Sequence, residues 1–375
     1  MRIAQVAPLW ESVPPKLYGG TERIVSYVTE ELVAMGHDVT LFASGDSETA
    51  ARLEAISPQA LRLKTGLFNR DAYLMMLHER GLGSAHDFDI IHSHLDFTGF
   101  PLARRNPVPV VTTLHGRLDL PELEPVYREF SEMPLVSISD AQRRPLPWAN
   151  WAGTIYHGLP RNMYSFQEGS KGYLAFLGRI APEKRPDQAI EIAKRAGIPL
   201  RIAAKVDPSD RVYFEAEVEP LLNHPLIEFV GEISDAEKNE FIGNAMALVC
   251  PYDWPEPFGL VLIEAFACGT PVVAYRRGSI PEIIDHGVTG YICDTLDEMV
   301  DAVGQVPLID RKQCRAAFDE RFTADRMARD YVALYERLLL EDGAMQAPRA
   351  VEFGRSNNES FKSASHSFPG GHRHV

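Results

Sequence analysis

Cysteine is scarce in this sequence and is confined to its second half. The four cysteines are Cys250, Cys268, Cys293 and Cys314, and no two of them form a C-x-x-C pair or show the spacing of a zinc site. Isolated cysteines of this kind are typical of small core residues in a reducing compartment. The sequence therefore indicates neither a disulfide framework nor a structural zinc site.

Long hydrophobic runs are also missing. Nowhere do about 18 apolar residues follow one another, which is the length a membrane-spanning helix needs. The N-terminal stretch MRIAQVAPLW carries no signal-cleavage pattern. We therefore expect a cytoplasmic protein.

Basic charge is in deficit, with 38 Lys and Arg against 52 Asp and Glu and a net charge of −14. This balance argues against nucleic acid as a partner, because such partners need a basic surface. Residues 1–165 carry 15 basic and 19 acidic side chains, so this half is repelled less by an anionic membrane. Residues 61–81 mix apolar side chains with arginines, which is compatible with peripheral contact at the inner membrane surface. Packing on the first domain is the favoured interpretation of that segment.

The alternation of short apolar runs with helical patterns predicts an α/β protein. At 375 residues the chain exceeds one ordinary core, so two domains of about 150 residues each are expected. Strand-like runs in the first half are at residues 2–7, 38–44, 89–94, 108–116, 134–139 and 154–158, and in the second half at 172–179, 199–206, 227–231, 246–251, 271–275 and 290–294. Such a pattern is typical of parallel sheets covered on both faces by helices.

The domain boundaries follow from a polar, turn-rich linker at 157–172. We predict two doubly wound, Rossmann-like domains, at 1–165 and 166–322, followed by a helix at 323–341 and a disordered tail at 342–375. Ligands of such sheets bind at the carboxyl ends of the strands. The site is therefore expected in a cleft where the two domains face each other.

Two glutamates, Glu256 and Glu264, flank the run EPFGLVLIE, which begins a helix near Gly259. Burying an unpaired carboxylate costs several kcal/mol, so each should have a partner. The first amides of a helix bind anions such as phosphate, and Gly259 lets the backbone come close. A carboxylate accepts hydrogen bonds from two hydroxyls at once, which suits a sugar.

This run resembles the Glu-x7-Glu motif of the retaining glycosyltransferases of family four, the group 1 glycosyl transferases with the GT-B fold. The resemblance implies that Glu256 holds donor-sugar hydroxyls and that Glu264 holds the ribose of the nucleotide. It also implies that the amides of Phe258, Gly259 and Leu260 meet sugar and phosphate. The alternative is a pair of solvated carboxylates on an amphipathic helix.

A second part of the resemblance is FLGRIAPEKRP, in which Arg179 and Lys184 stand at the end of a predicted strand. Two cations there can neutralise the charge of a departing nucleoside diphosphate. The family pattern continues with glycine after the lysine, whereas Arg185 follows here, so this loop departs from the family geometry. The alternative role for both cations is a surface salt bridge, which contributes little.

The resemblance extends to the first half. Gly19 and Gly20 match the family's Gly-Gly loop near the donor, and Ile233 matches a position beside the nucleobase. A dinucleotide-binding G-x-G-x-x-G is absent, which disfavours a nicotinamide enzyme. His115 ends a predicted strand, and the family's histidine at such a place reaches the donor sugar.

The sequence disfavours two candidate metal sites. His92, His94 and His115 are able in principle to bind a metal, but no carboxylate is spaced to support them. Asp87 and Asp89 mimic the Asp-x-Asp metal site of the other glycosyltransferase fold, yet they precede a strand rather than follow one.

Together with these residues, the resemblance implies a metal-independent hexosyltransferase without a cofactor. It would move a hexose with retention from a nucleotide-diphosphate sugar, with UDP or GDP, to an acceptor hydroxyl in polysaccharide or glycolipid synthesis. The alternatives are a nucleotide-sugar epimerase or hydrolase of the same fold, and a non-catalytic module that binds nucleotide sugars.

Overall fold

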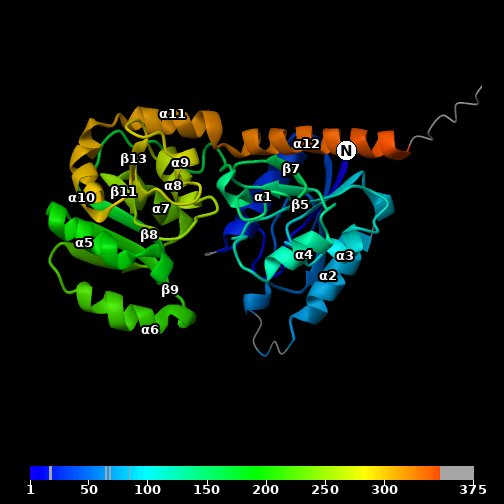
Figure 1. Cartoon of the computed structure of the whole chain (residues 1–375), viewed down its shortest axis with the longest axis horizontal. Helices are drawn as coiled ribbons and strands as arrows, with labels where there is room; N and C mark the ends of the chain where they lie inside the picture. The colour runs from blue at the N-terminus through cyan, green and yellow to red at the C-terminus, as the bar shows by residue number, and fades with distance from the viewer. Residues whose placement is uncertain (17–18, 64–65, 67–68, 84, 347–375) are drawn as a thin grey trace, which may run out of the picture.

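The computed structural model consists of two α/β lobes side by side (Figure 1). It describes residues 1–16, 19–63, 66, 69–83 and 85–346. The first lobe contains a seven-stranded parallel sheet in the order β3-β2-β1-β4-β5-β6-β7. Its strands are β1 (Arg2–Val6), β2 (Asp38–Ser44), β3 (Arg52–Ser57), β4 (Ile90–Ser93), β5 (Val110–Thr113), β6 (Leu135–Ser137) and β7 (Trp151–Thr154).

The second lobe contains a six-stranded parallel sheet in the order β10-β9-β8-β11-β12-β13. Its strands are β8 (Leu174–Ile180), β9 (Leu200–Val206), β10 (Ile227–Gly231), β11 (Ala247–Cys250), β12 (Val272–Tyr275) and β13 (Gly290–Cys293). In each sheet the strand order reverses beside the first strand, between β1 and β4 and between β8 and β11. Both are therefore doubly wound sheets, as the sequence predicts.

Helices cover both faces of each sheet. In the first lobe they are α1 (Gly20–Ala34), α2 (Asp71–Gly83), α3 (Phe100–Ala103) and α4 (Leu123–Glu129). After β8 follow α5 (Pro186–Ala196), α6 (Arg211–Tyr213), α7 (Asp235–Gly243), α8 (Leu260–Ala267), α9 (Ile280–Ile283), α10 (Leu296–Gln305), α11 (Arg311–Arg321) and α12 (Ala324–Gln346). A capping box begins α7, in which the Ser234 backbone N–H donates to the Glu237 carboxylate at 2.8 Å.

The helix α12 crosses from the second lobe to the first and lies along it (Figure 1). Its buried residues Met327, Tyr331 and Leu334 belong to one apolar cluster with Ile24 and Val28 of α1. The prediction ends this helix at 341, whereas it continues to Gln346. The tail predicted at 342–375 therefore begins too early, and its remaining residues, 347–375, lie outside the described part of the chain.

Two strand predictions for the first sheet are corrected. The strand β3 is missing from the prediction because it is an edge strand, with exposed or half-buried Arg52–Glu54 and no continuous apolar run. The strand predicted at 154–158 is instead β7, which ends at Thr154. One further backbone bond, from Ile155 N to Ser137 O at 2.9 Å, follows before the chain turns toward the second lobe.

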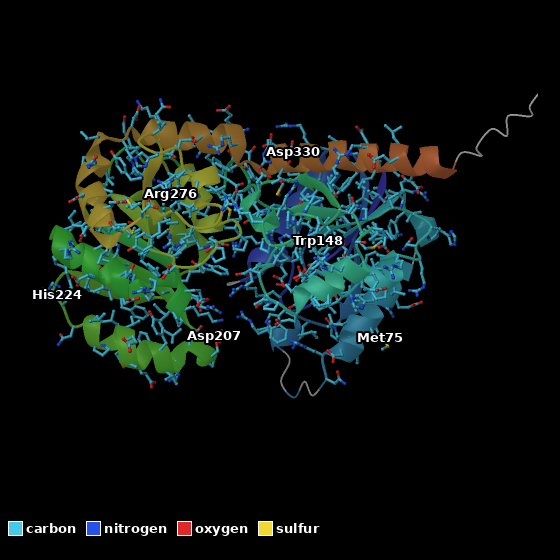
Figure 2. All side chains as sticks on the ribbon, viewed as in Figure 1. Met75, Trp148, Asp207, His224, Arg276 and Asp330 are labelled. Atoms are coloured by element: carbon cyan, nitrogen blue, oxygen red, sulfur yellow. The ribbon has the colours of Figure 1, made fainter. Side chains whose placement is uncertain are left out.

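The helix α2 occupies most of the segment considered for membrane contact. Leu77 is fully buried in the core of the first lobe, while Met75 is 73% exposed on the outer side of the helix (Figure 2). The helix thus packs on its lobe, as favoured above. No helix in the described residues is both long and apolar enough to cross a membrane.

Candidate functional site

The loop between β11 and α8 carries Glu256 to the carboxyl edge of the second sheet. Gly259 has φ = 88°, and a Cβ there would lie 2.9 Å from Leu262 Cδ1, so only glycine fits without strain. A Cβ on Gly278 would overlap the backbone of Glu256. The two glycines therefore let the loop fold tightly at the start of α8.

Glu256 is paired with Lys184. The carboxylate, whose residue is only 8% exposed, forms an ion pair with Lys184 Nζ and accepts a hydrogen bond from Trp254 Nε1 at 2.9 Å. The ammonium group also lies 4.1 Å from the centroid of the Tyr252 ring, a cation–π distance. One cation and one anion are therefore held together at the carboxyl edge of the sheet, with aromatic rings around them.

Arg179 lies near the end of β8 and pairs with acids of its own lobe. Its Nη2 is 2.6 Å from Glu183 Oε1, and its Nε is 3.4 Å from Asp210 Oδ2. The backbone N–H of Asp253 donates to Glu183 O at 2.9 Å, which joins this loop to the one that holds Glu256. The salt-bridge role considered for Arg179 is thus seen, and Arg179 lies at the end of the strand that leads into the turn of Lys184.

Glu264 is paired with a lysine that the sequence analysis did not single out. Lys238 Nζ of α7 lies 3.0 Å from Glu264 Oε1, and the Tyr164 hydroxyl donates to the same oxygen at 3.3 Å. The sequence predicts that each glutamate has a partner but does not name one. Glu264 lies inside α8, which packs beside α7. The charged residues of α7 alternate in sign, and this pattern does not indicate that the Lys238 side chain is buried against α8.

The Lys238 ammonium group stays charged although the side chain is mostly buried. Burial disfavours the ammonium, but Glu264 and Asp235 outweigh it, so the pKa of Lys238 lies above its ordinary value. The second oxygen of Glu264, Oε2, is buried and has no hydrogen-bond partner among the described residues. A buried acceptor of this kind is suited to a hydroxyl donor of a ligand.

The start of α1 lies against the start of α8. A Cβ on Gly20 would be 3.7 Å from Leu260 Cδ1, and buried Gly19 precedes the helix. Arg23, one turn into α1, forms an ion pair with Asp235 at the start of α7. Ile233 is half-buried two residues before Asp235. The structure therefore brings the Gly-Gly loop, Ile233 and the EPFGL run to the junction of the lobes.

His115 follows β5 and joins this junction through a second histidine. The His115 and His157 rings stack with centroids 5.3 Å apart, and His157 meets the Phe258 ring at 4.9 Å. The sequence analysis did not single out His157, which it placed where the strand predicted at 154–158 overlaps the linker at 157–172. With β7 ending at Thr154, it lies in the linker and at the site.

Burial keeps these histidines uncharged. It lowers the pKa of His115 to about 3, and it lowers the pKa of His157 well below its ordinary value, with further lowering by His115 and Arg326. No group of three or more His, Cys, Asp or Glu is arranged to hold a metal ion in the part of the chain that the structure describes. The rings instead hydrogen-bond to protein groups or stack on one another.

Direct bonds hold the lobes together beside the site. The Ser139 hydroxyl donates to Pro257 O at 2.6 Å, and the backbone N–H groups of Asp140 and Ala141 donate to the Glu282 carboxylate at 2.8 and 2.7 Å. Because Pro257 belongs to the EPFGL loop, the relative position of the lobes is linked to that of Glu256.

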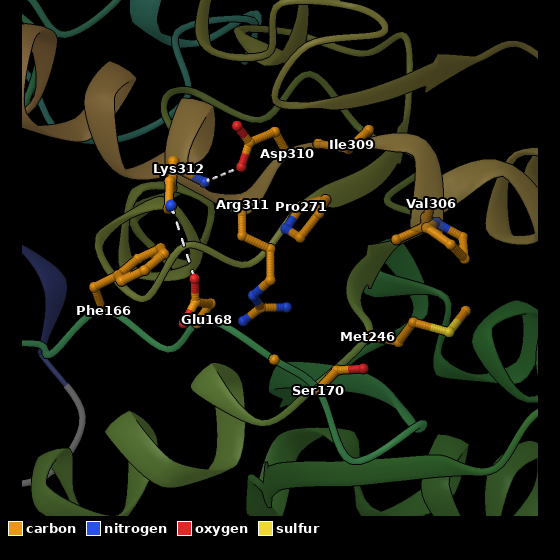
Figure 3. A pocket seen from close by; sticks show the side chains of 12 residues that line it. Phe166, Glu168, Ser170, Met246, Pro271, Val306, Ile309, Asp310, Arg311 and Lys312 are labelled. Carbon is orange, nitrogen blue, oxygen red and sulfur yellow. Dashed lines mark hydrogen bonds and ion pairs between the residues drawn. The ribbon is translucent and has the colours of Figure 1, made fainter.

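Two other features lie at the amino ends of the strands, away from the carboxyl ends where Glu256 lies. A cavity of about 390 Å³ is lined by Met246 and Pro271, which precede β11 and β12, and by Arg311 (Figure 3). Arg311 donates hydrogen bonds to the carbonyls of Gln167, Gly243 and Ala245, so its guanidinium group has a structural role. Asp89 pairs with Arg2 at 2.7 Å at the amino ends of β4 and β1. Neither feature faces the junction of the lobes.

Comparison with known proteins agrees with this geometry. The model of the group described as glycosyl transferases group 1 matches residues 164–317, and that of Glycosyltransferase Family 4 matches residues 18–158. The glycogen synthase of Mycobacterium tuberculosis is 26% identical over 383 aligned residues, 87% of this chain and 91% of that protein.

Two solved structures show the same fold. Sucrose-phosphate synthase of Thermosynechococcus elongatus has a TM-score of 0.75 at 18% identity, covering 91% of this chain and 100% of that one. HepE of Anabaena, in complex with UDP and glucose, has a TM-score of 0.69 at 17% identity, covering 90% and 99%. The protein is therefore a glycosyltransferase with the GT-B fold, and it belongs to the group 1 glycosyl transferases of family 4.

Proposed function

We propose that the enzyme transfers a hexose from a nucleotide-diphosphate sugar to an acceptor hydroxyl, with retention at the anomeric carbon and without a metal. The observation that carries this proposal is the buried Lys184–Glu256 pair beside the start of α8. The loop of Glu256 reaches His115 of the other lobe through the rings of Phe258 and His157. A cation, a carboxylate and the first amides of a helix are the groups that a diphosphate and a sugar need. UDP in the structure of a protein with this fold favours a uridine donor, with guanosine as the alternative.

Each residue has an assigned role. Lys184 and Arg179 neutralise the leaving diphosphate, and the amides of Phe258, Gly259 and Leu260 meet sugar and phosphate. Glu256 then orients the donor sugar and Glu264 binds the ribose, with Ile233 beside the base. Gly19, Gly20 and His115 contribute from the first lobe, residues 1–165, which also takes the acceptor, while residues 166–322 bind the donor.

Retention then proceeds by attack of the acceptor on the face that the diphosphate leaves. The new glycosidic bond forms as the sugar–phosphate bond breaks, and the departing phosphate takes the proton of the acceptor hydroxyl. Glu256 orients the sugar and does not attack it, because its carboxylate is already engaged by Lys184 and Trp254. Water must be kept out, since hydrolysis competes with transfer.

The test is transfer by purified variants with a panel of UDP and GDP sugars. Lys184→Ala and Glu256→Gln are each expected to lower kcat/KM by about 10²-fold, because each removes charge stabilisation or orientation in the transition state. Lys171→Ala, which removes an exposed lysine paired with Glu240, is the matched control and should transfer normally. Unchanged transfer in both site variants would remove the assignment.

Product analysis separates the alternatives. A transferase makes a new glycoside whose anomeric configuration, measured by NMR, matches that of the donor. An epimerase or hydrolase consumes the donor, or releases nucleotide, without an acceptor. A binding module shows donor affinity and no turnover.

A further inference from the structure

A chain of buried polar groups connects α12 with His115. Gln5 of β1 is fully buried and donates from Nε2 to the Tyr335 hydroxyl of α12 at 3.2 Å. Its Oε1 lies 2.9 Å from His94 Nε2, and His94 Nδ1 lies 2.9 Å from His115 Nε2. The carboxyl ends of β1, β4 and β5 are neighbours in the sheet, which is why these three side chains meet.

The hydrogen-bond roles along this chain are determined by Gln5. An amide oxygen only accepts, so the proton of His94 is on Nε2 and its Nδ1 is an acceptor. His115 Nε2 must then carry the proton that is donated to His94. A neutral imidazole has one N–H, so His115 Nδ1 is left with a lone pair.

A side branch agrees with this assignment. The Tyr335 hydroxyl accepts from Gln5, so it donates to His92 Nδ1 at 2.7 Å. His92 Nε2 then donates to Thr113 Oγ1, also at 2.7 Å. Burial holds the rings neutral, because it lowers the pKa of His92 and His115 to about 3 and that of His94 well below its ordinary value.

The other ring nitrogen of His115 has no partner in the part of the chain that the structure describes. His115 Nδ1 is buried and has no hydrogen-bond partner among the described residues. Buried polar atoms of native proteins usually have a partner, and an unpaired one calls for an explanation. A lone pair at the junction of the lobes is suited to a hydroxyl donor.

We propose that His94, oriented by Gln5, is a positioning residue that fixes His115 in the tautomer whose Nδ1 accepts a hydrogen bond from a substrate hydroxyl. This inference rests on the proposed function, in which His115 contributes to the sugar site. Tyr335 at the far end makes α12 part of the arrangement. A fixed tautomer prepares the ring before the sugar arrives, so no reorganisation is needed during the reaction.

The experiment measures the tautomer directly by ¹⁵N NMR of the full chain labelled at histidine. The His115 signals are identified as those lost in His115→Asn. The wild type is expected to show His115 protonated at Nε2 and bare at Nδ1. His94→Phe keeps a ring but has no acceptor, so it should convert His115 to a mixture of tautomers. His94→Asn places an acceptor oxygen near the position of the His94 Nδ1 atom, so His115 should keep the wild-type tautomer.

Kinetics with the best donor form the second readout. His94→Phe should lower kcat by about ten- to hundredfold with little change in the donor KM, because the ring is misoriented rather than absent. His94→Asn should restore most of the rate. Tyr335→Phe removes the hydroxyl that accepts the hydrogen bond of Gln5, so it should shift the His115 signals in the same direction as His94→Phe. It serves as the test if His94→Phe does not fold.

The proposal is overturned if the wild-type His115 carries its proton on Nδ1, or if neither His94→Phe nor Tyr335→Phe changes the tautomer. These spectra need no turnover. A protein with the expected tautomers but no transfer from any donor would contradict the proposed function and leave the positioning network standing.

Discussion

At the scale of single residues, the buried ion pair of Lys238 and Glu264 removes two charges from water. The Lys238 side chain is 16% exposed and that of Glu264 is 3% exposed, so neither charge is well solvated. Such a pair stabilises the fold only while both partners remain, because a single buried charge has lost its water without compensation. Both residues of the pair must therefore be present for the fold to be stable and for the site to form.

Lys238→Met should lower the free energy of unfolding by about 3–5 kcal/mol, since it leaves Glu264 buried without its cation. The double variant Lys238→Met/Glu264→Leu should recover much of that loss. Urea unfolding measures both. The matched control is Lys171→Met, whose exposed pair with Glu240 should contribute less than about 1 kcal/mol. A single variant no less stable than this control would contradict the account.

At the scale of elements, α12 is a clamp between the lobes. It begins at Ala324, directly after the second lobe, and its buried face packs on α1 of the first. Within the same helix, Leu334 is 4% exposed in this cluster and Leu340 is 75% exposed. The helix therefore contributes to stability through one face only.

Leu334→Ala should cost about 2–5 kcal/mol of unfolding free energy, because it removes buried methyl groups and leaves a cavity. Leu340→Ala in the same helix should stay within about 0.5 kcal/mol, as expected for a surface site. Denaturant midpoints measured on both variants decide the matter. Similar losses in the two would show that α12 is not held by its α1-facing side.

At the scale of the whole molecule, the buried histidines link stability to pH. His92 has a pKa lowered to about 3 by burial, whereas an unfolded histidine titrates near its ordinary value of 6.5. Between these values the unfolded chain binds more protons than the folded one. The free energy of unfolding therefore rises with pH in this window, and the stability is fully present above 6.5 and is lost as the pH falls toward 3.

Acidification from pH 6.5 to 4.5 should therefore destabilise the wild type, with about 1.4 kcal/mol per pH unit from each such histidine at most. His92→Gln, which cannot titrate, should lose stability less steeply over the same range. Urea unfolding at several pH values gives both slopes. Equal slopes would mean that His92 is not neutral in the folded protein.

The sequence alone determined the two doubly wound sheets and the loop before α8, because apolar runs, caps and glycines act locally and need no distant partner. It also singled out Lys184 and Glu256, whose residue types and setting name their chemistry. Only the tertiary structure decided that Lys238 pairs with Glu264, that His157 of the linker stacks on His115, and that α12 returns to the first lobe. Those contacts join residues far apart in the chain, so their energies depend on burial and geometry that no local pattern encodes.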